Sequence, residues 1–395
     1  MAAPVSERGA AADLRSRGEL ADVFALHGEH YRKSRKLPAA HLKAMRAIQS
    51  CRTEVLGGHM QRCDSCGAEH PCFNSCRHRA CPKCGSAATD RWLQRHKQEL
   101  LPCGYFHVVF TVPHELNPVF LVNPKILISI LFKAVSETLS DFGRTHLHGK
   151  IGFLAVLHTW DQTLGSHYHL HCVIPGGALH FDGSRWIAAR SNFLFPVPAL
   201  RIVFRAKFLD FLATVHQKGK LTFSGRTAPL ANPARFKQLL STVRKKKWVV
   251  YVKKPFASPE TVLGYLGRYT HRTAISNHRI LAVDQEHVTF SYKDRKDSSQ
   301  QKTMTLDAGE FIRRFLLHVL PSGLMRIRHF GFLANRSKAR QLALCRQALR
   351  VPPPEPATPS TDFLAWVEGR RRCPTCRTGT LIPVRTLAPI PWNSS

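Results

Sequence analysis

Cysteine and histidine side chains crowd one short stretch of the chain, and their spacing suits metal binding. The stretch contains two Cys-x2-Cys pairs, Cys63/Cys66 and Cys81/Cys84, about fifteen residues apart. Each short turn can direct two thiolates to one point, and four thiolates form the tetrahedral set that structural zinc prefers. Because such a closed set leaves no position for a substrate, the pairs predict a zinc module that folds on its metal rather than catalyses.

The same stretch holds four further donors that can form a second zinc site: Cys51, His59, Cys76 and His78. The alternative is that these residues are ordinary buried or solvated side chains. Another Cys-x2-Cys pair, Cys373 and Cys376, lies near the C-terminal end of the sequence. Alone it is half of a metal site, and an exposed turn explains it equally well.

A separate pair, His169 and His171, lies in an apolar run that is typical of a buried strand. Residues i and i+2 of a strand face the same side, so both imidazoles can bind one metal ion. If this strand pairs with the preceding one, His158 can become the third ligand, with Asp161 and Gln162 near the turn as the alternatives. Three protein ligands leave open coordination positions, which is a property of catalytic metal sites.

Two tyrosines four residues apart, Tyr265 and Tyr269, offer nucleophilic hydroxyl groups. On a helix, residues i and i+4 share a face, so both phenols can point to one substrate. An aromatic stripe packed in a core is the alternative. The neighbouring residues favour the approach of a phosphate backbone because they are small or cationic: Gly264, Gly267, Arg268, His271 and Arg272.

The composition indicates a polyanionic partner. Lys and Arg total 58 against 26 Asp and Glu, so the formal net charge is +32, which favours nucleic acid as the partner over a merely basic, solvated surface. Trp248 directly follows a run of cations and can stack on a base there. The candidate DNA-binding residues are Lys245, Lys246, Lys247, Arg268, Arg272, Arg326 and Arg328.

The sequence contains no apolar stretch long enough to span a membrane and no secretory signal at its start, so we expect a cytoplasmic protein. Cysteines in that reducing compartment are better candidates for metal ligands than for disulfide partners. A GxxxxGK[ST] phosphate loop is absent from the sequence, which argues against an ATPase or a helicase.

A small number of elements must position these residues. We expect strands at residues 105–112, 151–160 and 168–175, of which the last two form a hairpin. A helix capped by Ser258, with Pro259 and Glu260 in its first turn, presents the tyrosines. Further expected elements are helices at 39–50, 89–101, 124–142, 199–217, 233–246 and 307–320, and strands at 248–252, 280–283 and 288–292.

These elements indicate an α+β protein, with an N-terminal zinc-binding module followed by a central antiparallel β-sheet flanked by helices. The expected organisation is an N-terminal region at 1–101 with its zinc-binding module at about 51–84, a catalytic domain at 102–295, a helical part at 296–350, a Pro-rich linker at 351–361 and a tail at 362–395.

Several motifs occur in an order that resembles a known family. The form H-hydrophobic-H, followed by Y-x-x-x-Y, resembles the two-tyrosine HUH nucleases. From about Cys51 to Arg336 the whole order resembles the bacterial IS91-type insertion-sequence transposases, with the motifs CRTEVLGGHMQRCDSCG, NSCRHRACPKCG, FHVVFTVPHEL, HTWDQTLGSHYHLHCVIPGG, YLGRYTHRTAISNHRI and LPSGLMRIRHFGFLANR.

The resemblance implies an HUH-type fold and a set of residue roles. His169 and His171 would be the ligands of a catalytic Mg²⁺ or Mn²⁺ ion, and Tyr265 and Tyr269 would be the nucleophiles. The eleven-residue step from His158 to His169 resembles the spacing in conjugative relaxases, whose third ligand is a histidine. The segment 106–112 resembles the first conserved strand of the HUH fold.

The implied reaction nicks and rejoins single-stranded DNA at insertion-sequence ends through 5′-phosphotyrosine intermediates, which drives rolling-circle transposition. The implied partners are single-stranded transposon ends, target DNA and a host helicase. One ligand position departs from the family pattern: many members carry His directly before the second Cys pair, whereas this chain has Ala80 there and His78 two residues earlier.

Two other functions remain as alternatives. An HUH relaxase or plasmid replication initiator has the same active site, but the zinc module and the segment RIRHFGFLANR favour the transposase. A zinc-dependent DNA-binding regulator without catalysis is an alternative from another class, and it predicts that the tyrosine hydroxyls do not matter. The charge argues against a third class, a zinc hydrolase with a small substrate.

Overall fold

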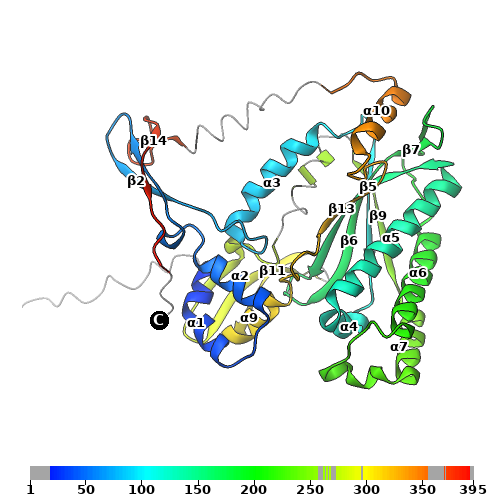
Figure 1. Ribbon diagram of the computed structural model, residues 1–395, viewed down its shortest axis with the longest axis horizontal. Helices are drawn as coiled ribbons and strands as arrows, with labels where there is room; N and C mark the ends of the chain where they lie inside the picture. Colours follow the sequence, from blue (N-terminus) through cyan, green and yellow to red (C-terminus); the bar gives the residue numbers. More distant parts are fainter. Residues whose placement is uncertain are drawn as a thin grey trace, which may run out of the picture.

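The computed structural model describes residues 18–256, 261–262, 264–265, 267, 273–294, 297–354, 369 and 371–391 (Figure 1). It has the expected α+β architecture, in which antiparallel sheets are covered by helices. Among the described helices, none is both long and apolar enough to cross a membrane.

A five-stranded antiparallel sheet forms the centre of the molecule, with the strand order β13-β5-β6-β3-β9. Its strands are β3 (Tyr105–Thr111), β5 (Gly152–Trp160), β6 (Ser166–Pro175), β9 (Val249–Phe256) and β13 (Ile327–Gly331). The expected hairpin is present, because β5 and β6 are neighbours in the sheet. Strand β13 was not expected, and it places the C-terminal part of the chain within the same sheet.

The two faces of this sheet have different uses. One face packs against α5 (Pro124–His146) and α6 (Val197–Gln217), which Figure 1 shows side by side along the sheet. Alternate residues of each strand enter that core, among them Val108 of β3, Leu157 of β5 and Leu170 of β6. The residues between them face the other side. That opposite face carries the histidines.

A second layer packs beside the central sheet and surrounds its own apolar core. It contains α1 (Leu20–Lys33), α2 (Ala39–Gln49), α9 (Ala308–Leu316) and a three-stranded sheet of β10 (Ile280–Val283), β11 (His287–Asp294) and β12 (Gln300–Asp307). Phe24 of α1 meets Phe315 of α9 edge to face, with ring centroids 5.7 Å apart. Trp160 and Leu164 also belong to this core, so the layer packs against the end of the β5–β6 hairpin.

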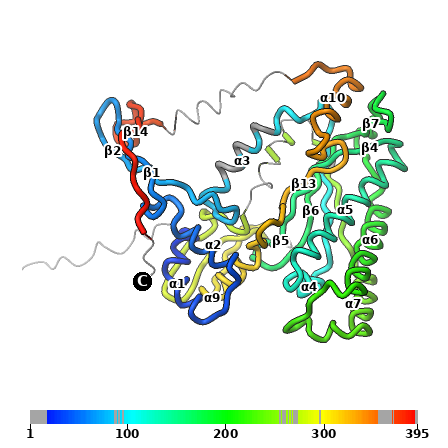
Figure 2. The backbone as a smooth tube through the Cα atoms, viewed as in Figure 1, coloured from blue at the N-terminus to red at the C-terminus, as the bar shows by residue number. Residues whose placement is uncertain are grey.

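The two ends of the described chain meet in a small third sheet. Its order is β14-β1-β2, formed by β14 (Leu381–Leu387), β1 (Gly58–Cys63) and β2 (Glu69–Phe73). Figure 2 shows the red C-terminal strand beside the blue N-terminal hairpin. We expected a tail apart from the zinc module, but backbone pairing of β14 with β1 makes the two segments one unit.

Further helices and strands lie around these layers. They are α3 (Pro82–Lys97), α4 (Asn117–Val122), α7 (Pro233–Lys245), α10 (Lys338–Leu349), β4 (Gly149–Lys150), β7 (Gly177–His180) and β8 (Trp186–Ala188). The expected helix at 307–320 ends earlier, at Leu316. The expected cap residues Ser258, Pro259 and Glu260 lie outside the described residues, whereas 261–262, 264–265 and 267 are helical.

Candidate active site

Three histidines meet on the face of the central sheet that α5 and α6 leave uncovered. His158 of β5 lies directly opposite His169 of β6, and His171 follows two residues later on the same face. Their ligand nitrogens all lie within 4.8 Å of one another, and the three side chains are buried. This arrangement fits a divalent ion with three imidazole ligands and open positions for substrate.

Hydrogen bonds to the second ring nitrogen orient two of these imidazoles. Nδ1 of His169 donates to the carbonyl oxygen of His167 at 2.9 Å, which leaves Nε2 as the nitrogen with the lone pair. Nδ1 of His171 lies 2.9 Å from Nε2 of His107. Such outer partners fix the tautomer and ring orientation that a metal ligand needs.

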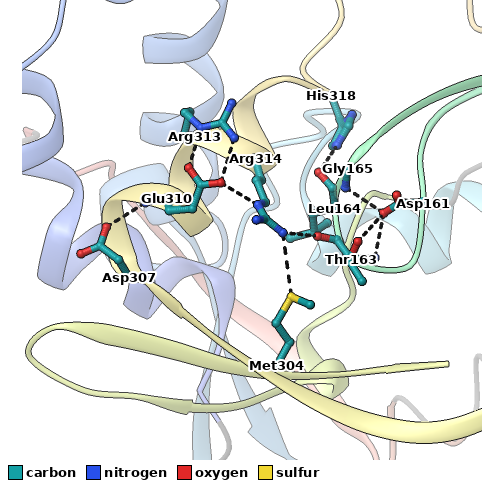
Figure 3. Close-up of polar contacts among 10 residues, drawn as sticks. All are labelled: Asp161, Thr163, Leu164, Gly165, Met304, Asp307, Glu310, Arg313, Arg314 and His318. Carbon is teal, nitrogen blue, oxygen red and sulfur yellow. Dashed lines mark hydrogen bonds and ion pairs between the residues drawn. The ribbon is translucent and has the colours of Figure 1, made fainter. Parts of the chain in front are cut away.

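The β5–β6 turn beside the histidines is held through three consecutive backbone carbonyls. Arg279 Nη2 donates to Gln162 O at 2.5 Å, Arg314 Nη1 to Thr163 O at 3.1 Å, and His318 Nε2 to Leu164 O at 3.0 Å. Figure 3 shows the last two contacts, which come from α9 and the residues after it. The neighbouring layer thus fixes the turn from which both histidine-bearing strands emerge.

Asp161 and Gln162, the alternative ligands, have other roles in the described chain. Asp161 Oδ1 accepts hydrogen bonds from the backbone N–H groups of Thr163 and Gly165, both at 2.8 Å, so this carboxylate caps the turn (Figure 3). Gln162 lines a neighbouring cavity of about 300 Å³ together with His169. The geometry therefore favours His158 as the third ligand.

The side chains that hold the β5–β6 turn, here called the clamp, are Arg279, Arg314 and His318. Burial and ion pairing keep His318 and the Arg314 partner Glu310 each in a single protonation state. Burial lowers the pKa of His318 to about 4, so its imidazole is neutral at pH 7, donates through Nε2 and accepts the Thr159 hydroxyl hydrogen at Nδ1, 3.1 Å away. Glu310 is bound by Arg313 and Arg314, and these hydrogen bonds lower the pKa of its carboxyl to about 2. Glu310 therefore stays ionised and orients the Arg314 guanidinium (Figure 3).

A tyrosine hydroxyl reaches the histidine cluster through a residue that the sequence analysis missed. Tyr265 is buried, and its Oη lies 2.8 Å from Nδ1 of His107 on β3. Burial first, and the nearby charge of Lys253 second, lower the pKa of His107 to about 3, so its imidazole is neutral. The signal was present in FHVVFTV, where His107 alternates with core residues, but its partner strand could not be read from the sequence. Tyr269 lies outside the described residues.

Eight cysteines gather in two groups of four, and the membership of both groups differs from the predicted sets. Cys51, Cys76, Cys81 and Cys84 form the first group, and Cys63, Cys66, Cys373 and Cys376 form the second. The predicted set is split because Cys81 caps α3, whereas Cys63 ends strand β1 of a separate hairpin. Among the described residues, neither His59 nor His78 belongs to these groups; His78 Nδ1 instead accepts the backbone N–H of Ala80 at 3.2 Å.

The first group has the chemistry of a structural zinc site. Its sulfurs lie 3.5 Å apart for Cys51 and Cys84, and 3.6 Å apart for Cys76 and Cys84. Four thiolates in such contact match the tetrahedral donor set that zinc prefers. The site lies at the N-terminal end of α3, against the core formed by α1, α2 and α9.

The candidate DNA-binding residues occupy different environments. Lys245, the last residue of α7, and the following Lys246 and Lys247 are exposed, although Lys246 pairs with Glu115 at 2.9 Å. The prediction that Trp248 stacks on a base is wrong, because this side chain is 1% exposed and its indole N–H donates to Val243 O.

Arg326 and Arg328 pack largely within the protein. The guanidinium of Arg328 lies 4.1 Å above the ring of Phe132, and burial lowers the pKa of Arg326 to about 10. Both are therefore less accessible to DNA than the lysines at the end of α7. Arg268 and Arg272 lie outside the described residues.

Comparisons with known proteins agree with these features. The family described as "Putative transposase" matches residues 152–341, and the family described as "Transposase zinc-binding domain" matches residues 23–112. "Putative transposase y4qJ" of Sinorhizobium fredii (strain NBRC 101917 / NGR234) is 44% identical over 396 residues, which cover 96% of this chain and 100% of that protein. "Transposase for insertion sequence element IS801" of Pseudomonas savastanoi pv. phaseolicola is 29% identical over 317 residues, which cover 80% and 75%.

The matched segments coincide with the two sites. The zinc-binding match contains the first cysteine group, and the other match contains the β5–β6 hairpin and Tyr265. Identity of 44% along the whole length of a relative joins both parts in one chain. The chain therefore belongs to the IS91-type transposases, with a zinc-binding domain ahead of its transposase domain.

Proposed function

We propose that the protein nicks and rejoins single-stranded DNA at insertion-sequence ends through 5′-phosphotyrosine intermediates, and so drives rolling-circle transposition. The observation that carries the proposal is the chain of contacts from Tyr265 Oη through His107 to His171, one of three histidines with metal-ligand geometry. These contacts support a reaction in which the tyrosine and the metal act on one phosphate. The transposase family supplies the substrate class.

The proposed metal site has a defined chemical contribution. A Mg²⁺ or Mn²⁺ ion held by His158, His169 and His171 would supply a Lewis acid that withdraws electron density from the scissile phosphate. Imidazole is a poor ligand for the hard Mg²⁺ ion and a weak one for Mn²⁺, so the choice between the two metals is part of the test.

Tyr265 performs the covalent step in this proposal. Its hydroxyl loses its proton to solvent and its oxygen attacks the phosphorus. The bond from phosphorus to the 3′ oxygen breaks, and that oxygen leaves as a 3′-hydroxyl after taking up a proton from solvent. The 5′-phosphate remains esterified to the tyrosine. The phosphotyrosine ester conserves the free energy of the broken phosphodiester bond. A later attack by a 3′-hydroxyl therefore rejoins the strand without a nucleotide cofactor.

His107 holds the nucleophile through its tautomer. If His171 uses Nε2 for the metal, its Nδ1 carries the hydrogen and donates to Nε2 of His107. A neutral His107 then carries its own hydrogen at Nδ1 and donates to Tyr265 Oη at 2.8 Å, while the same oxygen lies 3.1 Å from Nε2. A donor aimed at the phenol oxygen stabilises the phenolate, which is the nucleophilic form.

The remaining roles follow from sequence spacing. We assign Tyr269 as the second nucleophile, because helical residues four apart share a face, and it serves the other transposon end. Exposed lysines such as Lys245 and Lys247 contact phosphates of the transposon ends and the target DNA. A host helicase supplies the single strand.

The test is a search for a covalent adduct. Purified protein is incubated with labelled single-stranded end sequence and Mn²⁺ or Mg²⁺, then denatured and resolved by electrophoresis. The double variant Tyr265→Phe/Tyr269→Phe should form no adduct. Tyr168→Phe is the matched control, because Tyr168 precedes the ligand His169 but faces the helical side, stacked on Phe120.

The outcomes separate the candidate functions. An adduct with the double variant would end the proposal, and so would absence of cleavage by the unmodified protein, the result that a DNA-binding regulator predicts. A relaxase or replication initiator would also form an adduct, but it would not join both ends of an insertion sequence in a strand-transfer assay.

A further inference from the structure

The second group of thiols is assembled from opposite ends of the chain. Cys63 Sγ lies 3.6 Å from Cys376 Sγ, and Cys66 Sγ lies 3.8 Å from Cys373 Sγ. All four sulfurs lie within 4.8 Å of one another. A zinc–sulfur bond of about 2.3 Å gives a tetrahedron with edges of about 3.8 Å, so the spacing fits one zinc ion.

Backbone N–H groups surround two of these sulfurs. Ser65 and Cys66 donate to Cys63 Sγ at 3.4 and 3.5 Å, and Gly379 donates to Cys376 Sγ at 3.3 Å. Such donors favour the thiolate, which is the form that binds zinc. In each Cys-x2-Cys turn, backbone N–H groups therefore point at a cysteine sulfur, as they do in turns that carry metal ligands.

The backbone brings the two turns together in register. Strand β14 pairs with β1 from Leu387 opposite Gly58 to Leu381 opposite Cys63, with a bulge between Met60 and Gln61. Next to the sulfurs, Asp64 N–H donates to Thr380 O at 3.1 Å, and Thr380 N–H donates to Asp64 Oδ1 at 2.7 Å. Only glycine fits at position 379, because a Cβ atom there would collide with the Cys63 sulfur.

Apolar burial cannot hold this sheet together. Its buried cluster consists of Cys63, Cys373 and Leu381, with Cys376 packed against it. Ile382 and Val384 of β14 are exposed at 49% and 44%. Small units without a sufficient core depend on a metal or on disulfides, and the described cysteines are free thiols.

We propose that Cys63, Cys66, Cys373 and Cys376 bind a second structural Zn²⁺ ion, which fastens the C-terminal tail onto the N-terminal hairpin. The segment 371–391 is then an integral part of the zinc-binding unit rather than an appendage. The site is separate from the first cysteine group, and it does not depend on the proposed phosphotyrosine chemistry.

The test counts zinc and iron per chain by mass spectrometry of the full-length protein. Every sample carries His169→Ala and His171→Ala, so that the histidine site does not contribute. We expect two zinc ions in this parent, one in the variant Cys373→Ser/Cys376→Ser, and one in Cys51→Ser/Cys84→Ser. Cys72→Ser is the matched control, because Cys72 is exposed on β2 of the same sheet and outside both groups; it should retain two.

A second measurement covers the case in which the serine variants do not fold. Cys66 and Cys72 are both exposed, so an alkylating reagent reaches both in the parent protein unless a metal protects one. We expect rapid labelling of Cys72 and labelling of Cys66 only after chelation. One zinc ion in the parent, two in the Cys373/Cys376 variant, iron in place of zinc, or equal labelling of both thiols before chelation would each overturn the proposal.

Discussion

Tyr265 Oη lies 2.8 Å from Nδ1 of His107, and Nε2 of the same imidazole lies 2.9 Å from Nδ1 of His171. One buried imidazole thus connects the candidate nucleophile to the candidate metal site. Strand β3, which carries His107, lies next to β6, which carries His171, in the central sheet.

His107→Ala should lower the single-turnover rate of cleavage on the order of 10²-fold, the usual effect of removing one donor to a reacting oxygen. His107→Asn should recover part of the loss, since an amide nitrogen can replace Nδ1 as the donor. His107→Gln places its amide nearer the Nε2 position, which lies 3.1 Å from Tyr265 Oη rather than 2.8 Å, and should recover less. Affinity for single-stranded DNA should be the same in all three variants. A loss of affinity that matches the loss of rate would reduce His107 to a structural residue.

His169→Ala and His171→Ala should abolish cleavage while leaving DNA binding intact, because each removes a direct metal ligand. His158→Ala should raise the Mn²⁺ concentration needed for half-maximal cleavage. Gln162→Ala is the comparison at the turn, since this side chain lines the cavity beside His169. Metal titration by calorimetry and by cleavage assays measures both effects. The third-ligand assignment would have to move to the turn if Gln162→Ala were the more damaging change.

The histidine site could largely be predicted from sequence because its geometry is local. A short loop joins two apolar runs, and the alternation of a strand places His169 and His171 on one face. His158 then needed only an antiparallel hairpin to arrive opposite His169. His107 was not predicted because β3 pairs with β6 across a long stretch of intervening chain. The periodicity of a strand does not indicate which strands become its neighbours.

Long-range contacts also explain why the membership of the cysteine groups and the burial of Trp248 could not be predicted. Cys63 pairs with Cys376 across 313 positions, so the nearer pair Cys81/Cys84 was the more obvious partner in sequence. Trp248 follows four cations but packs against Phe204 and Phe208, with ring centroids 5.2 and 5.4 Å away. Both outcomes are decided by tertiary packing, which local spacing does not contain.

Binding to single-stranded DNA should weaken steeply with salt. With roughly six phosphate contacts, log K should fall against log salt concentration with a slope of about −4. Replacing Lys245 or Lys247 by Ala should make the slope shallower by about 0.7 each, whereas Lys246→Ala should have a smaller effect because Glu115 already pairs with Lys246. Fluorescence anisotropy over a salt series measures the slope. A flat response would contradict binding through the charge of the protein.

Stability should fall in mildly acidic solution through His318. Burial holds its pKa at about 4, against about 6.5 in an unfolded chain, so the folded protein favours the neutral imidazole. This stabilisation is complete above pH 6.5 and is lost as the pH falls toward 4; its full size is about 3 kcal/mol. Between pH 7 and pH 5 the unmodified protein should therefore lose about 2 kcal/mol more than His318→Gln. Urea unfolding at both pH values gives the difference, and equal losses would exclude His318 as the cause.

Arg314 and Arg313 allow a direct test of the clamp on the β5–β6 turn. Both side chains bind Glu310, but Arg314 alone of the two also donates to Thr163 O (Figure 3). Arg314→Ala leaves that carbonyl without its cationic donor, a loss of about 1.5–3 kcal/mol, and it should loosen the turn beside His158 and His169. Hydrogen exchange of the amides at 161–166 should become faster, and the affinity for Mn²⁺ should fall. Arg313→Ala should change neither, because its guanidinium is directed to Glu310 and away from the turn. If the two variants loosened the turn equally, Glu310 rather than the Arg314–Thr163 contact would be the element that holds it.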